Sequence, residues 1–99
     1  MAEVVWTAEA QRWFQKIYDY IAEHNEEAAY RTVCSIHEHA EILRQFPEIG
    51  YRYREHPPVR VLLYGHYRIA YLVVPSGDVQ ILGVFHGAMD LGKYLTPRP

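Results

Sequence analysis

The sequence predicts an α+β domain in which a helical hairpin covers one face of a mainly antiparallel sheet. Helical periodicity occupies the first half of the chain, and three runs rich in β-branched and aromatic residues occupy the second half. Short segments with turn chemistry separate those runs. Helices and strands that are segregated along the chain are typical of α+β architecture. We expect one domain over residues 1–99, because a chain of this length builds one hydrophobic core and not two.

The first half of the chain predicts a strand followed by two helices. The apolar run Ala2–Trp6 can add a strand to the sheet. Thr7 supplies an N-cap hydroxyl, and apolar residues then recur every three or four positions as far as Ile21. Asn25 starts a second helix. The apolar stripe of that helix consists of Ala29, Val33, Ile36, Ala40 and Leu43.

The second half predicts a three-stranded meander. Pro47 ends the second helix because it lacks an amide donor, and residues 46–58 are expected to form a loop. The strands are expected at residues 59–64, 67–74 and 79–86, with turns at Gly65-His66 and at residues 75–78. After His86 the tail has room for one short helical turn. The predicted order is therefore β-α-α-β-β-β with a short C-terminal helical tail.

The turns also predict the register of the meander. A two-residue turn at Gly65-His66 sets Tyr64 opposite Tyr67, Leu62 opposite Ile69, and Arg60 opposite Tyr71. The second turn is expected to set Val74 opposite Val79 and Tyr71 opposite Leu82. This register sorts side chains onto two faces that are both mostly apolar. If helices cover one face only, the other is a large apolar surface, which is typical of a partner site.

Composition and charge narrow the class of protein. With 49% hydrophobic and 22% charged residues, the chain is typical of a globular protein. No run reaches the roughly 18 apolar residues of a membrane span, and the N-terminus lacks a signal-peptide pattern, so we expect a cytoplasmic location. The single cysteine, Cys34, fits a reducing compartment. The net charge of −2 is uneven: residues 1–48 carry −5 and residues 49–99 carry +3, so the sheet half is where an anionic partner would dock if the protein has one.

Five short strings, taken in order, resemble the RelE/ParE superfamily of toxins from type II toxin–antitoxin modules, often labelled plasmid stabilisation proteins. The strings are Thr7-Ala8-Glu9-Ala10, Phe46-Pro47-Glu48-Ile49-Gly50, Val59-Arg60, Tyr67-Arg68-Ile69-Ala70-Tyr71 and Val84-Phe85-His86-Gly87. The resemblance covers nearly the whole chain. It implies a toxin that a cognate antitoxin holds inactive.

The family divides by target, and the sequence favours one branch. ParE-like members are associated with poisoning of DNA gyrase, whereas RelE-like members cut messenger RNA on the ribosome. RelE-like members tend to carry basic side chains on the open face of the sheet, where this sequence is expected to be apolar. The pI near 6.3 also argues against a phosphate-led binder. A ParE-like gyrase toxin is therefore expected, with a ribosome-dependent endoribonuclease and a non-toxic binding module of the same fold as alternatives.

Three groups of residues are candidates for function. In a ribonuclease, His86 would protonate the leaving 5′ oxygen, Arg68 would stabilise charge on the phosphorane, and the resemblance implies a role for Tyr94. The candidates for binding a target or nucleic acid are Arg52, Arg54, Arg60 and Lys93. An antitoxin helix or strand is expected to cover the open face at Val61, Leu63, Ala70, Leu72, Ile81 and Phe85.

Each candidate has a structural alternative. Arg52 and Arg54 alternate with tyrosines that can stack on bases, but the same segment can be a solvated loop. Arg60 and Arg68 can bind an anion or pair with a carboxylate on the helices, and His86 can be a structural hydrogen-bonding residue. The histidines lack metal-ligand spacing, and there is no phosphate-binding glycine loop, so we expect neither a metal nor a cofactor.

Overall fold

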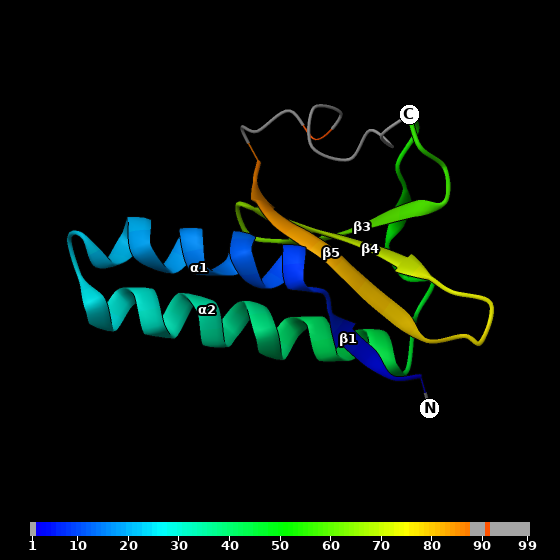
Figure 1. Cartoon of the computed structure of the whole chain (residues 1–99), viewed down its shortest axis with the longest axis horizontal. Helices are drawn as coiled ribbons and strands as arrows, with labels where there is room; N and C mark the ends of the chain where they lie inside the picture. The colour runs from blue at the N-terminus through cyan, green and yellow to red at the C-terminus, as the bar shows by residue number, and fades with distance from the viewer. Residues whose placement is uncertain (1, 88–90, 92–99) are drawn as a thin grey trace.

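The structure, a computed structural model, describes residues 2–87 and Leu91. Strand β1 (Val4–Trp6) leads into helix α1 (Ala8–Ala22), which is followed by helix α2 (Glu26–Ala40) and a 3₁₀ turn, η1 (Glu41–Arg44). The remaining strands are β2 (Tyr51–Arg52), β3 (Val59–Tyr64), β4 (Tyr67–Val73) and β5 (Val79–His86). They form one five-stranded sheet in the order β1-β5-β4-β3-β2. Figure 1 shows the two helices side by side beneath one face of this sheet, which confirms the predicted fold class.

Both helices begin at the predicted cap residues. Thr7 Oγ1 accepts a hydrogen bond from the amide of Ala10 at 3.1 Å and donates one to the carbonyl of Ile81 at 2.8 Å. Asn25 Oδ1 accepts a hydrogen bond from the amide of Ala28 at 2.9 Å. Each cap satisfies an amide at the helix N-terminus that has no partner within the helix. Thr7 also ties the start of α1 to β5, the strand that adjoins β1.

The sheet contains one strand that the sequence did not predict. β1 pairs in parallel with β5, and the other pairs are antiparallel. Tyr51 and Arg52 form β2 beside Val61 and Arg60, within the segment that was predicted to be a loop. Such a two-residue strand is too short to produce a periodic signal in the sequence. None of the helices within residues 2–87 is long and apolar enough to cross a membrane.

The register of the meander is confirmed in its first hairpin and wrong in part of its second. The pairs of β3 with β4 are those predicted, from Tyr64 with Tyr67 to Arg60 with Tyr71. In the second hairpin, Ala70 pairs with Gly83, but Tyr71 pairs with Ile81 instead of Leu82, which has no partner on β4. The shift is a β-bulge, and one extra residue in a strand reverses the facing of every residue beyond it.

The bulge moves two residues into the core beneath the helices. Val79 and Ile81 were expected on the open face, but both are fully buried on the helix side. They join a core in which four residues of the helical segment meet the sheet at Leu62, Ile69, Tyr71 and Val84. Those four residues of the helical segment are Ala10, Ile36, Ala40 and Leu43. The apolar stripe predicted for the second helix is therefore largely confirmed.

The opposite face of the sheet, called the far face below, is closed by the chain itself. Its buried cluster consists of Val59, Val61, Ala70, Phe85 and Leu91, with Trp13, Tyr53, Leu72 and Leu82 packed around it. Trp13 of α1 also reaches this face: the centroid of its ring lies 4.9 Å from the centroid of the Phe85 ring. The expectation of a large exposed apolar face is therefore wrong.

Candidate functional site

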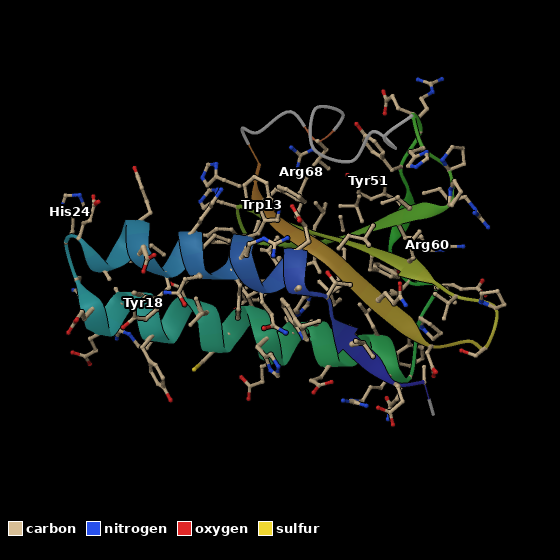
Figure 2. The ribbon with its side chains drawn as sticks, viewed as in Figure 1. Trp13, Tyr18, His24, Tyr51, Arg60 and Arg68 are labelled. Atoms are coloured by element: carbon tan, nitrogen blue, oxygen red, sulfur yellow. The ribbon has the colours of Figure 1, made fainter. Side chains whose placement is uncertain are left out.

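An apolar groove runs between helix α1, the start of β4 and the end of β5. Its volume is about 410 Å³. It is lined by Trp13, Lys16, Ile17, Tyr20, Ile21, Tyr67, Val84 and His86. Figure 2 shows Trp13 between α1 and the sheet, at the side of the groove. Burial in the groove wall raises the pKa of Tyr67 above its ordinary value of 10.0, as expected beside apolar surface.

The groove combines aromatic surface with positive charge. Tyr20 is 73% exposed, so its ring is accessible to a partner. The Nζ atom of Lys16 lies 4.6 Å from the centroid of the Trp13 ring, in a cation–π contact. None of the eight described lining residues carries a carboxylate. The groove is thus suited to an apolar segment that also carries negative charge.

A second, more polar hollow of about 350 Å³ lies at the tip of the β3–β4 hairpin. It is lined by Leu63, Gly65, His66, Tyr67, Arg68, His86 and Gly87. The imidazole rings of His66 and His86 lie 6.2 Å apart, nearly parallel, and the Tyr67 ring meets His86 edge-on. Arg68 donates a hydrogen bond from Nη2 to the carbonyl of Gly87 at 3.1 Å. Two of the predicted catalytic residues, Arg68 and His86, therefore reach the same hollow although they leave neighbouring strands in different directions.

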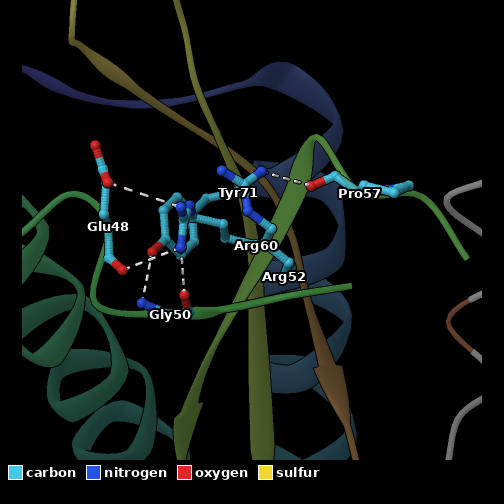
Figure 3. Close-up of polar contacts among 6 residues, drawn as sticks. All are labelled: Glu48, Gly50, Arg52, Pro57, Arg60 and Tyr71. Carbon is cyan, nitrogen blue, oxygen red and sulfur yellow. Dashed lines mark hydrogen bonds and ion pairs between the residues drawn. The ribbon is translucent and has the colours of Figure 1, made fainter. Parts of the chain in front are cut away.

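Arg60 lies elsewhere and is bound to the loop that precedes β2. Figure 3 shows its guanidinium group donating to the carbonyls of Glu48 and Gly50, at 3.1 and 2.8 Å. The Glu48 carboxylate lies 3.8 Å away, and only 13% of the Arg60 side chain is exposed. Figure 2 shows Arg60 and Arg68 at well-separated places on the sheet. These contacts indicate that Arg60 holds the loop in place. The carboxylate that it pairs with, Glu48, lies in the loop and not on the helices as the structural alternative had expected.

We expect the substitution Arg60→Met to reduce the free energy of unfolding by about 2 kcal/mol, because two carbonyl groups of the loop lose a charged donor. Urea denaturation measures this. Arg52→Met is the matched control, since Arg52 is exposed and makes one 3.3 Å bond, to the carbonyl of Pro57; its expected change is below about 0.5 kcal/mol. Loss of target binding by the Arg60 variant with unchanged stability would contradict the structural role.

Tyr71 joins the same loop to the sheet from within the helix-side core. Its side chain is fully buried, and its hydroxyl oxygen accepts a hydrogen bond from the amide of Gly50 at 2.8 Å. Burial raises the pKa of Tyr71 above 10.0, while the Gly50 amide and the charge of Arg60 oppose that shift. The phenol therefore stays protonated in the folded chain at a pH where it ionises in the unfolded chain.

This raised pKa predicts a loss of stability in alkaline solution. Below pH 10 the phenol is protonated in both states, and above it the unfolded chain releases its proton first, so stability falls as the pH rises toward the folded pKa. We expect the urea midpoint of Tyr71→Phe, although lower at pH 8, to fall less between about pH 9 and 11 than that of the unchanged chain. Parallel curves for the two proteins would refute this.

The predicted antitoxin-binding residues do not form one exposed surface. Ile81 lies under the helices, because the bulge changes its facing. Val61, Ala70 and Phe85 are buried in the far-face cluster, and Leu72 is partly buried beside it. Leu63 is the exception, with 57% of its surface exposed. The predicted set is therefore corrected: a partner that binds the chain as described would touch Leu63 but not Ile81.

The remaining predicted residues divide into exposed and undescribed positions. Arg52 and Arg54 are both exposed, as a solvated loop or a binding loop would require. Lys93 and Tyr94 lie outside the described residues. Within residues 2–87 and Leu91, no group of three or more histidine, cysteine, aspartate or glutamate side chains is arranged to hold a metal ion.

Sequence reasoning missed the groove residues on α1, although a signal for them was present. Trp13, Ile17 and Ile21 were expected in the stripe that packs on the sheet, and Tyr20 and Lys16 were not among the candidates. Tyr20 lies three positions after Ile17 and seven after Trp13, so it widens that apolar stripe on one side. A helix with so wide an apolar arc has more surface to cover than its own sheet provides.

Comparisons with known proteins agree with the fold. The family model for the ParE toxin of the type II toxin–antitoxin system parDE matches residues 4–91. A solved structure of the chromosomal ParDE toxin–antitoxin system from P. aeruginosa is 28% identical, with a TM-score of 0.75 over 87% of this chain and 96% of that one. A RelBE toxin–antitoxin complex from Mycobacterium tuberculosis is 25% identical, with a TM-score of 0.68 over 86% and 96%. Curated protein sequences give no significant match.

A helical hairpin packed on one face of a five-stranded sheet, together with the structural match to ParDE and RelBE systems and the family match, places the chain in the RelE/ParE superfamily. Because the match covers most of its length, the chain belongs to the ParE toxin family of type II toxin–antitoxin systems.

Proposed function

We propose that this protein is a ParE-like toxin that acts on DNA gyrase and is neutralised by a cognate antitoxin bound in the groove along α1. The ParE family match supports the choice of gyrase. The observation that carries the choice of gyrase is the burial of the apolar far face, where Val59, Val61, Ala70 and Phe85 pack together with Leu91. A ribonuclease that used this face would need cationic groups there to stabilise a phosphorane, but the buried cluster contains none, and Arg68 lies at its end beside Phe85.

The groove supports an antitoxin as the partner. Solved relatives of this chain are parts of toxin–antitoxin systems, and a groove of apolar and aromatic side chains is suited to an amphipathic helix. Lys16 and His86 in its lining favour a helix with acidic residues beside its apolar stripe. The proposed site replaces the far face, which the chain covers itself, as the main antitoxin surface.

A gyrase assay tests the proposed target. The purified chain is expected to inhibit supercoiling by gyrase and to trap cleaved DNA, and its induction in cells is expected to cause an SOS response and filamentation. Addition of the protein encoded beside its gene should prevent the inhibition of gyrase in the assay, and its co-expression should prevent the response in cells. Normal supercoiling in the presence of an excess of folded chain would exclude gyrase as the target.

The hollow at the β3–β4 tip supports a second candidate, a ribosome-dependent endoribonuclease. It brings Arg68 and His86 together, with His66 beside them, as acid–base chemistry on a phosphodiester would require. Mapping of messenger RNA ends after induction distinguishes the two candidates, because only the ribonuclease produces new ends on translated messages. Arg68→Gln and His86→Gln would then abolish cleavage. Harmless induction with neither effect would indicate a binding module that retains only the fold.

A further inference from the structure

One edge of the sheet is left open within the described part of the chain. β2 pairs only with Arg60 and Val61, whereas β3 continues to Tyr64. The chain reaches β2 from Gly50, whose amide is bonded to Tyr71 in the helix-side core, so it leaves the sheet at this point. No strand within residues 2–87 therefore lies beside the outer edge of β3 at Leu62–Tyr64, which we call the open edge.

The backbone of Leu63 faces outward at the open edge. In a two-residue hairpin the residues that flank the turn form a hydrogen-bonded pair, and such pairs alternate with pairs whose amides and carbonyls point away from each other. Tyr64 and Tyr67 flank the turn, so Leu63 and Arg68 form a pair of the second kind. Val59 lies four residues before Leu63, and its carbonyl accepts a hydrogen bond from the amide of Tyr53 at 2.8 Å, on the side away from β4. This bond agrees with the alternation. Leu63 thus presents one donor and one acceptor to an incoming strand.

The open edge lacks the protection that exposed strand edges usually have. Leu62–Tyr64 contains no proline, lysine or bulge, and Leu63 is 57% exposed. The opposite edge of the sheet is different, because β5 beyond its β1 partners lies against α1, where Trp13 packs on Phe85. Within the described chain, the stretch of β3 beyond β2 is therefore an edge that is accessible to an extended segment.

The surroundings of the open edge indicate the chemistry of its partner. Arg68 lies directly opposite Leu63, and the hollow beside them also holds His66 and His86 but no carboxylate among its described residues. An acidic segment complements this charge. A second copy of the chain would bring the same cationic hollow to the pairing, so like charges would oppose it.

We propose that the open edge binds an extended segment of the antitoxin, with an apolar residue two positions from an acidic one so that both lie on the face of Leu63 and Arg68, as an added strand beside β3. The segment exchanges main-chain hydrogen bonds with Leu63, its apolar side chain packs on the Leu63 side chain, and its carboxylate faces Arg68. This inference rests on the proposed function, since it assigns a second contact to the same partner. The groove binds a helix, and the open edge binds a strand.

Amide hydrogen exchange, followed by NMR, tests the added strand. The probe is the protein encoded beside the gene for this chain, purified in complex with the full chain. The Leu63 amide is expected to exchange rapidly in the free chain and at least about 100-fold more slowly in the complex. The amides of Leu62 and Tyr64 are internal controls, because they face β4 and should be protected in both states.

The possible outcomes separate this inference from the proposed function. A complex in which the Leu63 amide stays unprotected overturns the added strand and leaves the toxin–antitoxin proposal intact, whereas failure of the two proteins to associate overturns both. If the Leu63 amide is protected in the free chain and loses this protection on dilution, the open edge pairs with a second copy of the chain. That result also overturns the added strand of the antitoxin. Leu63→Pro should weaken the complex at least about tenfold more than Leu63→Ser, which keeps the amide. If the proline variant does not fold, the exchange measurement still decides.

Discussion

Replacement of Gly50 by alanine is expected to lower the free energy of unfolding by about 3 kcal/mol. A methyl group at this position would lie 2.7 Å from both the Tyr71 hydroxyl and the carbonyl of Val61. Neither atom can move cheaply, because the hydroxyl belongs to a buried core residue and the carbonyl belongs to the sheet. The hydrogen bond from Gly50 to Tyr71 and the bonds of Arg60 to this loop would be strained together.

Urea denaturation measures the effect, and Gly65→Asn is its control. Gly65 has φ +57°, and no atom lies within 4 Å of the place that a Cβ atom would take, so the position has room for a side chain. Asparagine tolerates that backbone conformation. Its expected change is below about 1 kcal/mol. Equal destabilisation by the two variants would show that backbone conformation, and not the close approach of Tyr71 and Val61, restricts position 50.

The double substitution Lys16→Glu and Tyr20→Glu is expected to weaken antitoxin binding at least about 100-fold, which corresponds to about 2.7 kcal/mol. It replaces a cation and an aromatic ring in the groove by two carboxylates, which repel an acidic partner and must lose water when an apolar segment binds. Both residues are exposed, so the free energy of unfolding should change by less than about 0.5 kcal/mol. The variant should therefore be toxic and escape neutralisation.

Tyr30→Glu is the control for the groove variant. Tyr30 is a tyrosine of similar exposure, 64%, but it lies on α2 and does not line the groove. Its affinity for the antitoxin, measured by titration calorimetry, should match that of the unchanged chain. Full neutralisation of the double variant would place the antitoxin elsewhere, and equal loss of affinity in both variants would indicate a general effect of added negative charge.

The local elements could be predicted because their signals lie within a few residues. Thr7 and Asn25 cap the helices by bonds to amides three residues ahead, and Gly65 supports a turn that fixes the pairing of β3 with β4. The bulge at Leu82 could not be predicted in this way. It depends on which side chains best fill the core under α1 and α2, and those helices are distant from β5 in the sequence.

The candidate site shows the same division. Arg68 and His86 were identified from residue type and resemblance, and the structure brings them to one hollow. Arg60 was expected at a binding site, but it binds the carbonyls of Glu48 and Gly50. The groove could not be recognised from the sequence, because an exposed tyrosine and a buried one look alike until the sheet is placed against α1.

The sequence by itself determined the α+β class, the two helices with their caps, the register of the first hairpin and the resemblance to RelE/ParE toxins. These features depend on periodicity and turn chemistry, which act over short stretches of chain. Only the tertiary structure decided which face of the sheet Ile81 joins, that Leu91 and Trp13 pack on the far face, and that the groove and the open edge form between distant segments. Those outcomes depend on packing between distant segments, where the burial of apolar surface is shared among elements that the sequence does not place in contact.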